Sequence, residues 1–211
     1  MPVIDGITIT QDDYKIMFGF ISKEDDLKTG VICKISDHPS GLEAIEFNEL
    51  WTIIEADNNC NKNYYNHIAT WYGDVDYSYT GVRHKAQPMP YYFDYIAKDI
   101  EEEHGFKVGY FNCLLANLYT NKGIAPHSDN ESIFRDSEGD IGAVATFSLG
   151  GTAITRITSK RGIGEPLSLK LRDGSCYVMP EGSFQDNYNH QVSKPDSRNP
   201  RRISLTFRHI P

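Results

Sequence analysis

After residue 106 the sequence divides into short segments that suit β-strands. Each segment is rich in β-branched and aromatic residues, and Gly, Pro, Asn or Asp separates it from the next. The segments are FNCLLANLY, IGAVATFSLG, TAITRIT, LSLKL, SCYVMP and RISLTFR. This pattern predicts an antiparallel sandwich or barrel of about 100 residues.

Two amphipathic helices are predicted ahead of this β region. In the first, apolar residues recur at helical spacing over about residues 42–55: Phe47, Leu50, Trp51 and Ile54. The second begins near Pro90 and ends at Gly105, and four apolar residues share one of its faces: Phe93, Ile96, Ala97 and Ile100.

Length and composition suit one globular domain, since the chain has 211 residues with 39% hydrophobic content. No apolar run approaches the ~18 residues of a membrane span. The start, MPVIDGITIT, lacks the basic and apolar regions of a signal peptide, so an intracellular protein, in cytoplasm or nucleus, is expected. The four cysteines form no C-x-x-C pair, and Cys113 and Cys176 are expected to be buried thiols.

The net charge of −8 disfavours a generic nucleic-acid binder, but the charge is uneven. Residues 1–109 carry 9 Lys/Arg and 19 Asp/Glu, whereas residues 110–211 carry 12 and 10. The C-terminal half can therefore meet a polyanion that the total charge would discourage, or it is an ordinary solvated surface.

A candidate metal site begins with His127 and Asp129, one residue apart in GIAPHSDNES. His190, in FQDNYNHQV 63 residues later, is expected in a loop after the strand SCYVMP and supplies a third ligand. Two imidazoles and one carboxylate leave three open positions on an octahedral metal, as in non-haem Fe(II) oxygenases. Taken singly, His190 is equally a loop histidine bonded to backbone.

The last strand places a polar set on one face, because side chains alternate along a strand. This set is Arg202, Ser204, Thr206 and Arg208. If that face lines the interior, two buried guanidiniums require anions, and a small dicarboxylate supplies them. The alternative is an edge strand with solvated arginines. Asn117 and Tyr119 also share a face, just before the His-x-Asp segment, and both can hydrogen-bond a carboxylate.

Several motifs resemble, in order and rough spacing, those of the AlkB family of Fe(II)/2-oxoglutarate dioxygenases. They are Asn117-Leu-Tyr119, His127-Ser-Asp129 with Glu131, SLGG, Gln185 ahead of His190, and the run from Arg202 to Arg208. The segment WYGDVDYSYTG also looks like the family's substrate lid. The resemblance covers about residues 68–211, and residues 1–65 carry no motif that can be placed.

The resemblance implies an α+β fold with a double-stranded β-helix (jelly-roll) core, N-terminal helices and a substrate-recognition lid. Residues 1–109 would form the N-terminal extension and lid, and residues 110–211 the catalytic core, in one globular unit. Fe(II), 2-oxoglutarate and O2 are the implied cofactor and co-substrates.

The resemblance also assigns roles to residues. The implied iron ligands are His127, Asp129 and His190. The implied 2-oxoglutarate contacts are Arg202 with Tyr119 at the distal carboxylate, Arg208 and Asn117 at the chelating end, and Ser204. Many members have Asn where this chain has Ser204, so that contact is expected to be weaker.

The implied substrate is an N-alkylated base of the 1-methyladenine or 3-methylcytosine type, flipped out of its stack. It would lie between His127 and Tyr79, with Tyr77 nearby, and Glu131 would read its exocyclic amine. The implied reaction is oxidative demethylation that releases formaldehyde, succinate and CO2. Tyr77 and Tyr79 are equally consistent with ordinary strand packing.

The expected partner is single-stranded RNA or DNA, because the acidic N-terminal half offers little to a duplex backbone. A monomer is expected. The candidate backbone contacts are Lys122, Arg156, Lys160, Arg161, Arg198 and Arg201, which are equally plain surface. Two alternatives remain: an Fe(II)/2-oxoglutarate hydroxylase of a protein or small molecule, and a non-catalytic β-barrel binding module.

Overall fold

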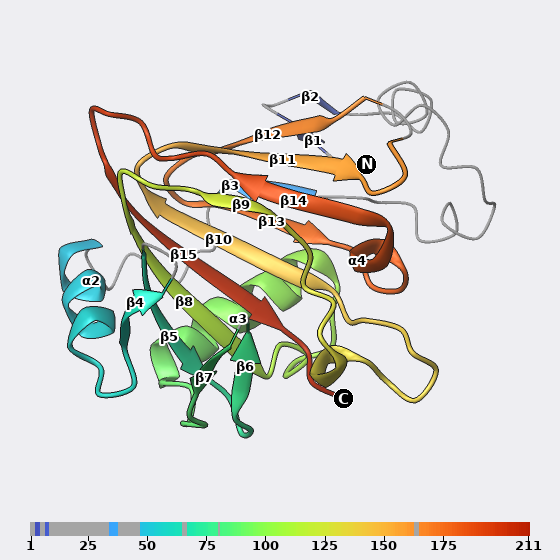
Figure 1. Ribbon diagram of the computed structural model, residues 1–211, viewed down its shortest axis with the longest axis horizontal. Coiled ribbons are helices and arrows are strands. Elements are labelled where there is room, and N and C mark those ends of the chain that lie inside the picture. The colour runs from blue at the N-terminus through green and yellow to red at the C-terminus, as the bar shows by residue number, and fades with distance from the viewer. Residues whose placement is uncertain are drawn as a thin grey trace.

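The computed structural model describes residues 3–4, 7–8, 34–37, 47–64, 67–79, 81–162 and 165–211. Residues 42–46, at the start of the first expected helix, lie outside these ranges. Two antiparallel β-sheets form the body of the molecule, with helices against the larger sheet (Figure 1). None of the helices in the described ranges is long and apolar enough to cross a bilayer.

The larger sheet has seven strands, and residues 1–109 and residues 110–211 both contribute strands to it. In spatial order they are β3 (Lys34–Asp37), β13 (Ser175–Met179), β10 (Val144–Gly150), β15 (Arg201–Arg208), β8 (Cys113–Thr120), β5 (His67–Tyr72) and β4 (Asn61–Tyr64). β5 pairs with β8, so the sheet continues across residue 109. The assignment of residues 1–109 to an extension and lid, and of residues 110–211 to a catalytic core, stays a prediction.

The smaller sheet has four strands and faces the larger one (Figure 1). In order they are β12 (Leu167–Leu171), β11 (Ala153–Ser159), β14 (Tyr188–Val192) and β9 (Ile124–His127). Apolar side chains of β10 and β13 pack between the sheets against those of β11 and β12. The expected jelly-roll core is therefore confirmed, and the six segments expected as strands are β8, β10, β11, β12, β13 and β15.

One expectation about the smaller sheet is wrong, because His190 lies in β14 and not in a loop. β14 is a short polar strand without the β-branched and aromatic pattern of the others. It is nevertheless a strand because β11 and β9 on either side satisfy its backbone groups.

Two helices cover the outer face of the larger sheet: α2 (Phe47–Ala56) and α3 (Tyr91–His104). Seven of the eight apolar residues expected from helical spacing are buried, namely Leu50, Trp51, Ile54, Phe93, Ile96, Ala97 and Ile100, and the eighth, Phe47, is partly buried against the same cluster. They pack against the odd-numbered residues of β15, Ile203, Leu205 and Phe207. Gly105 ends α3 with a positive φ of 76°, a backbone conformation that glycine adopts readily.

The remaining elements are small. They are the hairpin β6 (Tyr77–Tyr79) and β7 (Val82–His84), the pair β1 (Val3–Ile4) and β2 (Ile7–Thr8), the 3₁₀ turn η2 (Ser132–Phe134) and α4 (Phe184–Asn187). Cys113 and Cys176 are fully buried, as expected. Burial raises the pKa of the Cys113 thiol to about 12 and also raises the pKa of Cys176.

Gly123 lets β9 approach β14 closely, because a Cβ at this position would lie 2.0 Å from the Val192 carbonyl oxygen. We expect Gly123→Ala to push β9 away from β14 and to lower the free energy of unfolding by about 1–3 kcal/mol, as overpacking does. Urea unfolding of the metal-free protein measures this change. Ile154→Ala, in the same sheet with a half-exposed side chain, is the control and should change stability less. Equal losses in the two variants would contradict the close-approach argument.

Candidate functional site

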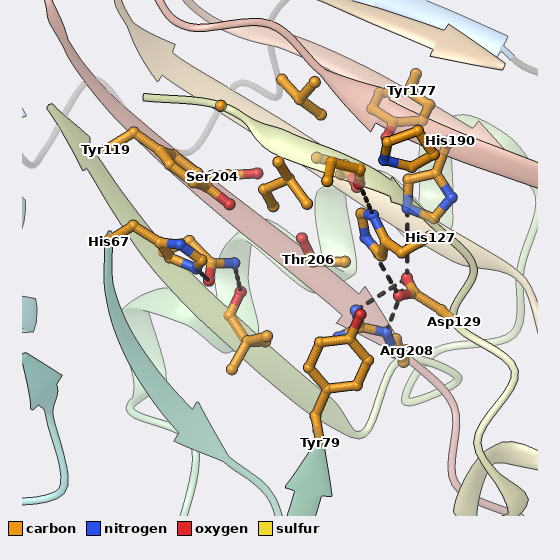
Figure 2. A pocket seen from close by; sticks show the side chains of 18 of the residues that line it. His67, Tyr79, Tyr119, His127, Asp129, Tyr177, His190, Ser204, Thr206 and Arg208 are labelled. Carbon is orange, nitrogen blue, oxygen red and sulfur yellow. Dashed lines mark hydrogen bonds and ion pairs between the residues drawn. The ribbon is translucent and has the colours of Figure 1, made fainter. Parts of the chain in front are cut away.

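A cavity of about 380 Å³ lies between the two sheets, within the range of roughly 300–1,000 Å³ that is usual for small-molecule sites. Residues of both sheets and of the β6–β7 hairpin line it (Figure 2). Most of the expected site residues lie in its wall: Asn117, Tyr119, Ser204, Arg208, His127, Asp129, His190, Tyr77 and Tyr79. The other two, Arg202 and Glu131, lie directly behind lining residues, since Arg202 contacts Tyr119 and Glu131 contacts Tyr77.

The three expected metal ligands come together at one end of this cavity (Figure 2). His127 ends β9 and pairs with His190 in the β9–β14 register, while Asp129 lies two residues past the strand. The ligand atoms all lie within 4.8 Å of one another. The Nε2 atoms of His127 and His190 lie 3.9 and 4.0 Å from the Asp129 carboxylate oxygens.

The orientation of His127 and the ionisation of the other two side chains suit a metal. His127 Nδ1 lies 2.9 Å from the Ala125 carbonyl, an acceptor, so Nδ1 acts as the donor and Nε2 is the ring nitrogen on the side of Asp129. Burial, followed by the neighbouring His127, lowers the pKa of His190 to about 3, so this imidazole is neutral near pH 7. Burial alone would raise the pKa of Asp129, but Arg208 and the two histidines outweigh it and lower this pKa to about 2.

Two imidazoles and one ionised carboxylate are a donor set that fits Fe(II), and they leave coordination positions for co-substrates. Asp129 and His190 are buried, and His127 is partly buried. A divalent cation would therefore be held at the wall of the cavity rather than on the molecular surface.

Arg208 is buried beside Asp129 and forms a two-point ion pair with it. Its Nη2 and Nε lie 2.9 and 3.2 Å from Asp129 Oδ2. The third nitrogen, Nη1, is buried and hydrogen-bonds none of the described residues. Arg208 thus orients the carboxylate and keeps the N–H groups of Nη1 for a further group.

Arg202 is buried without a carboxylate partner among the described residues, in contrast to Arg208. Its Nη2 donates to the hydroxyls of Ser148 (2.7 Å) and Ser204 (3.3 Å), and its guanidinium lies over the Tyr119 ring at 5.5 Å. Its Nε has no partner within the described structure, and burial lowers the pKa of the guanidinium. An unpaired buried cation is destabilising, so this position suits the carboxylate of a bound molecule.

The β8–β15 register sets the expected co-substrate residues opposite one another. Tyr119 pairs with Arg202, and Asn117 pairs with Ser204. All four side chains belong to the inner surface of the larger sheet, as the alternation of polar residues indicated.

His67, at the start of β5, is a cavity residue that sequence reasoning missed. Its Nε2 lies 3.1 Å from Asn117 Oδ1, and its ring lies 4.7 Å from that of Tyr119. It therefore packs against two expected co-substrate residues. A single histidine ahead of the recognisable motifs gave no signal, since its position depends on the pairing of β5 with β8.

The expected substrate residues lie on the side of the cavity away from Tyr119, where Figure 2 shows Tyr79 pointing inward near Asp129 and Arg208. Tyr77 is buried and stacks on Trp71 at 4.5 Å, and its hydroxyl donates to Glu131 Oε1 at 2.7 Å. Both tyrosines line the cavity, and the hydroxyl of Tyr77 also holds Glu131.

Glu131 has one free oxygen, because Oε2 is buried and meets no partner among the residues described. Burial, followed by the charge of Asp129, raises the pKa of Glu131. A cation or an N–H donor that reached Oε2 from the cavity would relieve this unfavourable environment.

Three of the basic residues considered as nucleic-acid contacts also contact groups of the protein itself. Arg198 pairs with Asp196 at 3.2 Å, and Arg201 lies over the rings of Phe47 and Trp51. Lys160 donates hydrogen bonds to Ser128 Oγ, between two of the expected metal ligands, and to the Gln185 carbonyl.

Comparison with known proteins agrees with this geometry. The model of the 2OG-Fe(II) oxygenase superfamily matches residues 46–208. Alpha-ketoglutarate-dependent dioxygenase alkB homolog 3 of Bos taurus is 31% identical over 157 residues, which are 68% of this chain and 51% of that protein. The RNA replication polyprotein of Apple stem pitting virus is 33% identical over 132 residues, 63% of this chain and 5% of the polyprotein.

The solved structure of OsALKBH1 has the same fold, with a TM-score of 0.61 at 16% identity. The similarity covers 84% of this chain and 98% of that one. The chain spans about half the length of the alkB homolog 3 protein that it matches.

The fold and the His-Asp-His site define an Fe(II)- and 2-oxoglutarate-dependent dioxygenase, for which Fe(II), 2-oxoglutarate and O2 are the cofactor and co-substrates. Within the 2OG-Fe(II) oxygenase superfamily, the chain belongs to the AlkB family.

The Arg208–Asp129 pair generates a stability prediction. Arg208→Met leaves a buried carboxylate without its cation and should lower the free energy of unfolding of the metal-free protein by about 3–5 kcal/mol. Chemical denaturation in the presence of a chelator measures the difference. Arg198→Met, which breaks an exposed ion pair, is the matched control and should leave the denaturation midpoint unchanged. A midpoint of Arg208→Met equal to that of the wild type would contradict the prediction.

Proposed function

We propose that this protein demethylates N-alkylated bases of the 1-methyladenine and 3-methylcytosine type in single-stranded RNA or DNA. The proposed products are the repaired base, formaldehyde, succinate and CO2. The observation that carries the proposal is the position of Glu131, whose free carboxylate oxygen is buried close to the metal ligand Asp129 and to Tyr77 of the cavity wall. Methylation at these ring nitrogens makes the base cationic, and a carboxylate favours that cation over a neutral base.

In this proposal Tyr77 keeps Oε1 of Glu131 engaged through a 2.7 Å hydrogen bond. Oε2 then remains to accept a hydrogen bond from the exocyclic amine of the base. Tyr79 and His127 stack on the two faces of the base, since both line the cavity and aromatic rings tolerate any base. The base enters the cavity only when it is unstacked.

The co-substrate would lie along the inner face of β15. Arg202, with Tyr119 and Ser204, binds the distal carboxylate of 2-oxoglutarate, because no acid among the described residues pairs with its guanidinium. Arg208 and Asn117 orient the other end, next to the proposed iron ligands His127, Asp129 and His190. Bound Fe(II), with 2-oxoglutarate and O2, supplies the oxidising chemistry that acts on the N-methyl group.

Two observations favour a single-stranded substrate. The acidic residues 1–109 offer few cations to a duplex backbone, and Arg201 lies against the rings of Phe47 and Trp51. RNA and DNA should both be tested, because one relative is a viral RNA replication polyprotein. A monomer that acts in the cytoplasm or nucleus stays part of the proposal.

Formaldehyde release from methylated oligonucleotides tests the proposal. Single-stranded RNA and DNA that contain 1-methyladenine or 3-methylcytosine should give formaldehyde only when Fe(II) and 2-oxoglutarate are both added. Matched duplexes should react more slowly, and unmethylated strands should give none. Absence of turnover on every methylated strand, while 2-oxoglutarate is still consumed, would favour the hydroxylase of a protein or small molecule.

Glu131→Ala separates base recognition from the oxidative chemistry. It removes a hydrogen bond to a charged group, worth about 1.5–3 kcal/mol, so formaldehyde release should fall about 10- to 100-fold. Consumption of 2-oxoglutarate without nucleic acid should persist, because Glu131 is not among the proposed iron or co-substrate ligands. Glu138→Ala, an exposed acid a few residues later, is the control. If both variants release formaldehyde like the wild type, Glu131 does not read the base.

A further inference from the structure

The loop that carries Asp129 lies outside the β-sheets. β9 ends at His127, and within the described structure this strand pairs only with β14. Asp129 therefore has no ladder partner to fix its backbone, although its carboxylate must keep a defined position next to two histidines. Another part of the protein has to hold this loop.

Gln185 of α4 provides one attachment. It is fully buried, and its Oε1 accepts a hydrogen bond from the Asp129 backbone N–H at 3.1 Å. Its Nε2 lies 3.4 Å from Met179 Sδ, a weak acceptor. The orientation of the amide follows, because the N–H of Asp129 requires an oxygen opposite it.

Lys160 provides a second attachment between the same two segments. Its Nζ donates to Ser128 Oγ and to the Gln185 carbonyl, both at 2.8 Å. Its backbone N–H donates to the Asn187 carbonyl at 2.9 Å. Lys160 thus bridges α4 and the residue that separates the two ligands of the loop.

These bonds connect the two segments that carry the metal ligands. Gln185 and His190 are five residues apart in one continuous segment, and Ser128 lies between His127 and Asp129. On the opposite side, Arg208 attracts the Asp129 carboxylate. Gln185 holds the backbone of Asp129 while Arg208 holds its side chain, so the carboxylate is oriented from both directions before a metal binds.

We propose that Gln185 and Lys160 are positioning residues that preorganise the metal site by fastening the 127–129 loop to α4. The inference rests on the metal site of the proposed function and extends it to residues that do not themselves bind metal or substrate. Replacing a residue that hydrogen-bonds to a metal ligand typically weakens metal binding about 10- to 100-fold.

Titration calorimetry with Mn(II) as the probe, without oxygen turnover, tests the inference. We expect Gln185→Met and Lys160→Met to raise the Kd for Mn(II) by about 10-fold or more. Lys160→Arg, which keeps a donor, should recover most of the affinity. Lys170→Met, an exposed lysine on β12, is the matched control and should bind Mn(II) like the wild type.

Two further measurements separate positioning from folding. Circular dichroism shows whether each metal-free variant is folded at the temperature of the titration. If Gln185→Met does not fold, the Kd of Lys160→Met for Mn(II) tests the inference. The visible band that forms when Fe(II) and 2-oxoglutarate bind anaerobically should shift in the positioning variants and not in Lys170→Met.

The outcomes are distinct. A folded Lys160→Met with the Kd and band of the wild type overturns the inference and leaves the metal site intact. Failure of the wild type to bind Mn(II), or equal binding by wild type and His190→Ala, overturns the metal site itself and the inference with it.

Discussion

Two guanidinium groups are buried on the inner face of β15, and the surrounding side chains are arranged to accommodate both charges. Arg208 has an internal anion in Asp129, whose low pKa keeps it ionised. Arg202 meets hydroxyl groups and an aromatic ring, without an acid among the described residues. The protein therefore balances the charge of Arg208 with an internal carboxylate and that of Arg202 with neutral groups, which is the asymmetry that the proposed binding of a dicarboxylate with one end at the metal requires.

The alternation of apolar and polar residues along β15 could be predicted from the sequence, and it indicated that the two sets lie on opposite faces of the sheet. Odd-numbered residues such as Leu205 pack under α2 and α3, and even-numbered residues such as Ser204 face the cavity. The register could not be predicted, because the pairing of Tyr119 with Arg202 depends on how β8 aligns with β15 in the folded sheet. The sequence therefore indicated which residues of β8 and β15 share a face, and the fold determined which of them lie opposite one another.

Other features depend on contacts between segments distant in sequence. His190 lies in a strand because β9 and β11 flank it, and the local sequence has too few β-forming residues to indicate this. His67 belongs to the cavity because β5 extends the larger sheet beside β8. Tyr79 was expected against the base, with Tyr77 nearby. Both line the cavity, and the contact of the Tyr77 hydroxyl with Glu131 could not be predicted without knowledge of side-chain positions.

The burial of Cys113 has a chemical consequence for an enzyme of this proposed activity. Its Sγ donates to the Arg208 carbonyl at 3.3 Å, so this thiol lies on the strand next to the active-site arginine. Formaldehyde is an electrophile, and the species that reacts with electrophiles is the thiolate. Because the pKa of Cys113 is raised to about 12, almost none of it is thiolate near pH 7. If the proposed reaction releases formaldehyde, this buried and protonated thiol beside Arg208 would react with it only slowly.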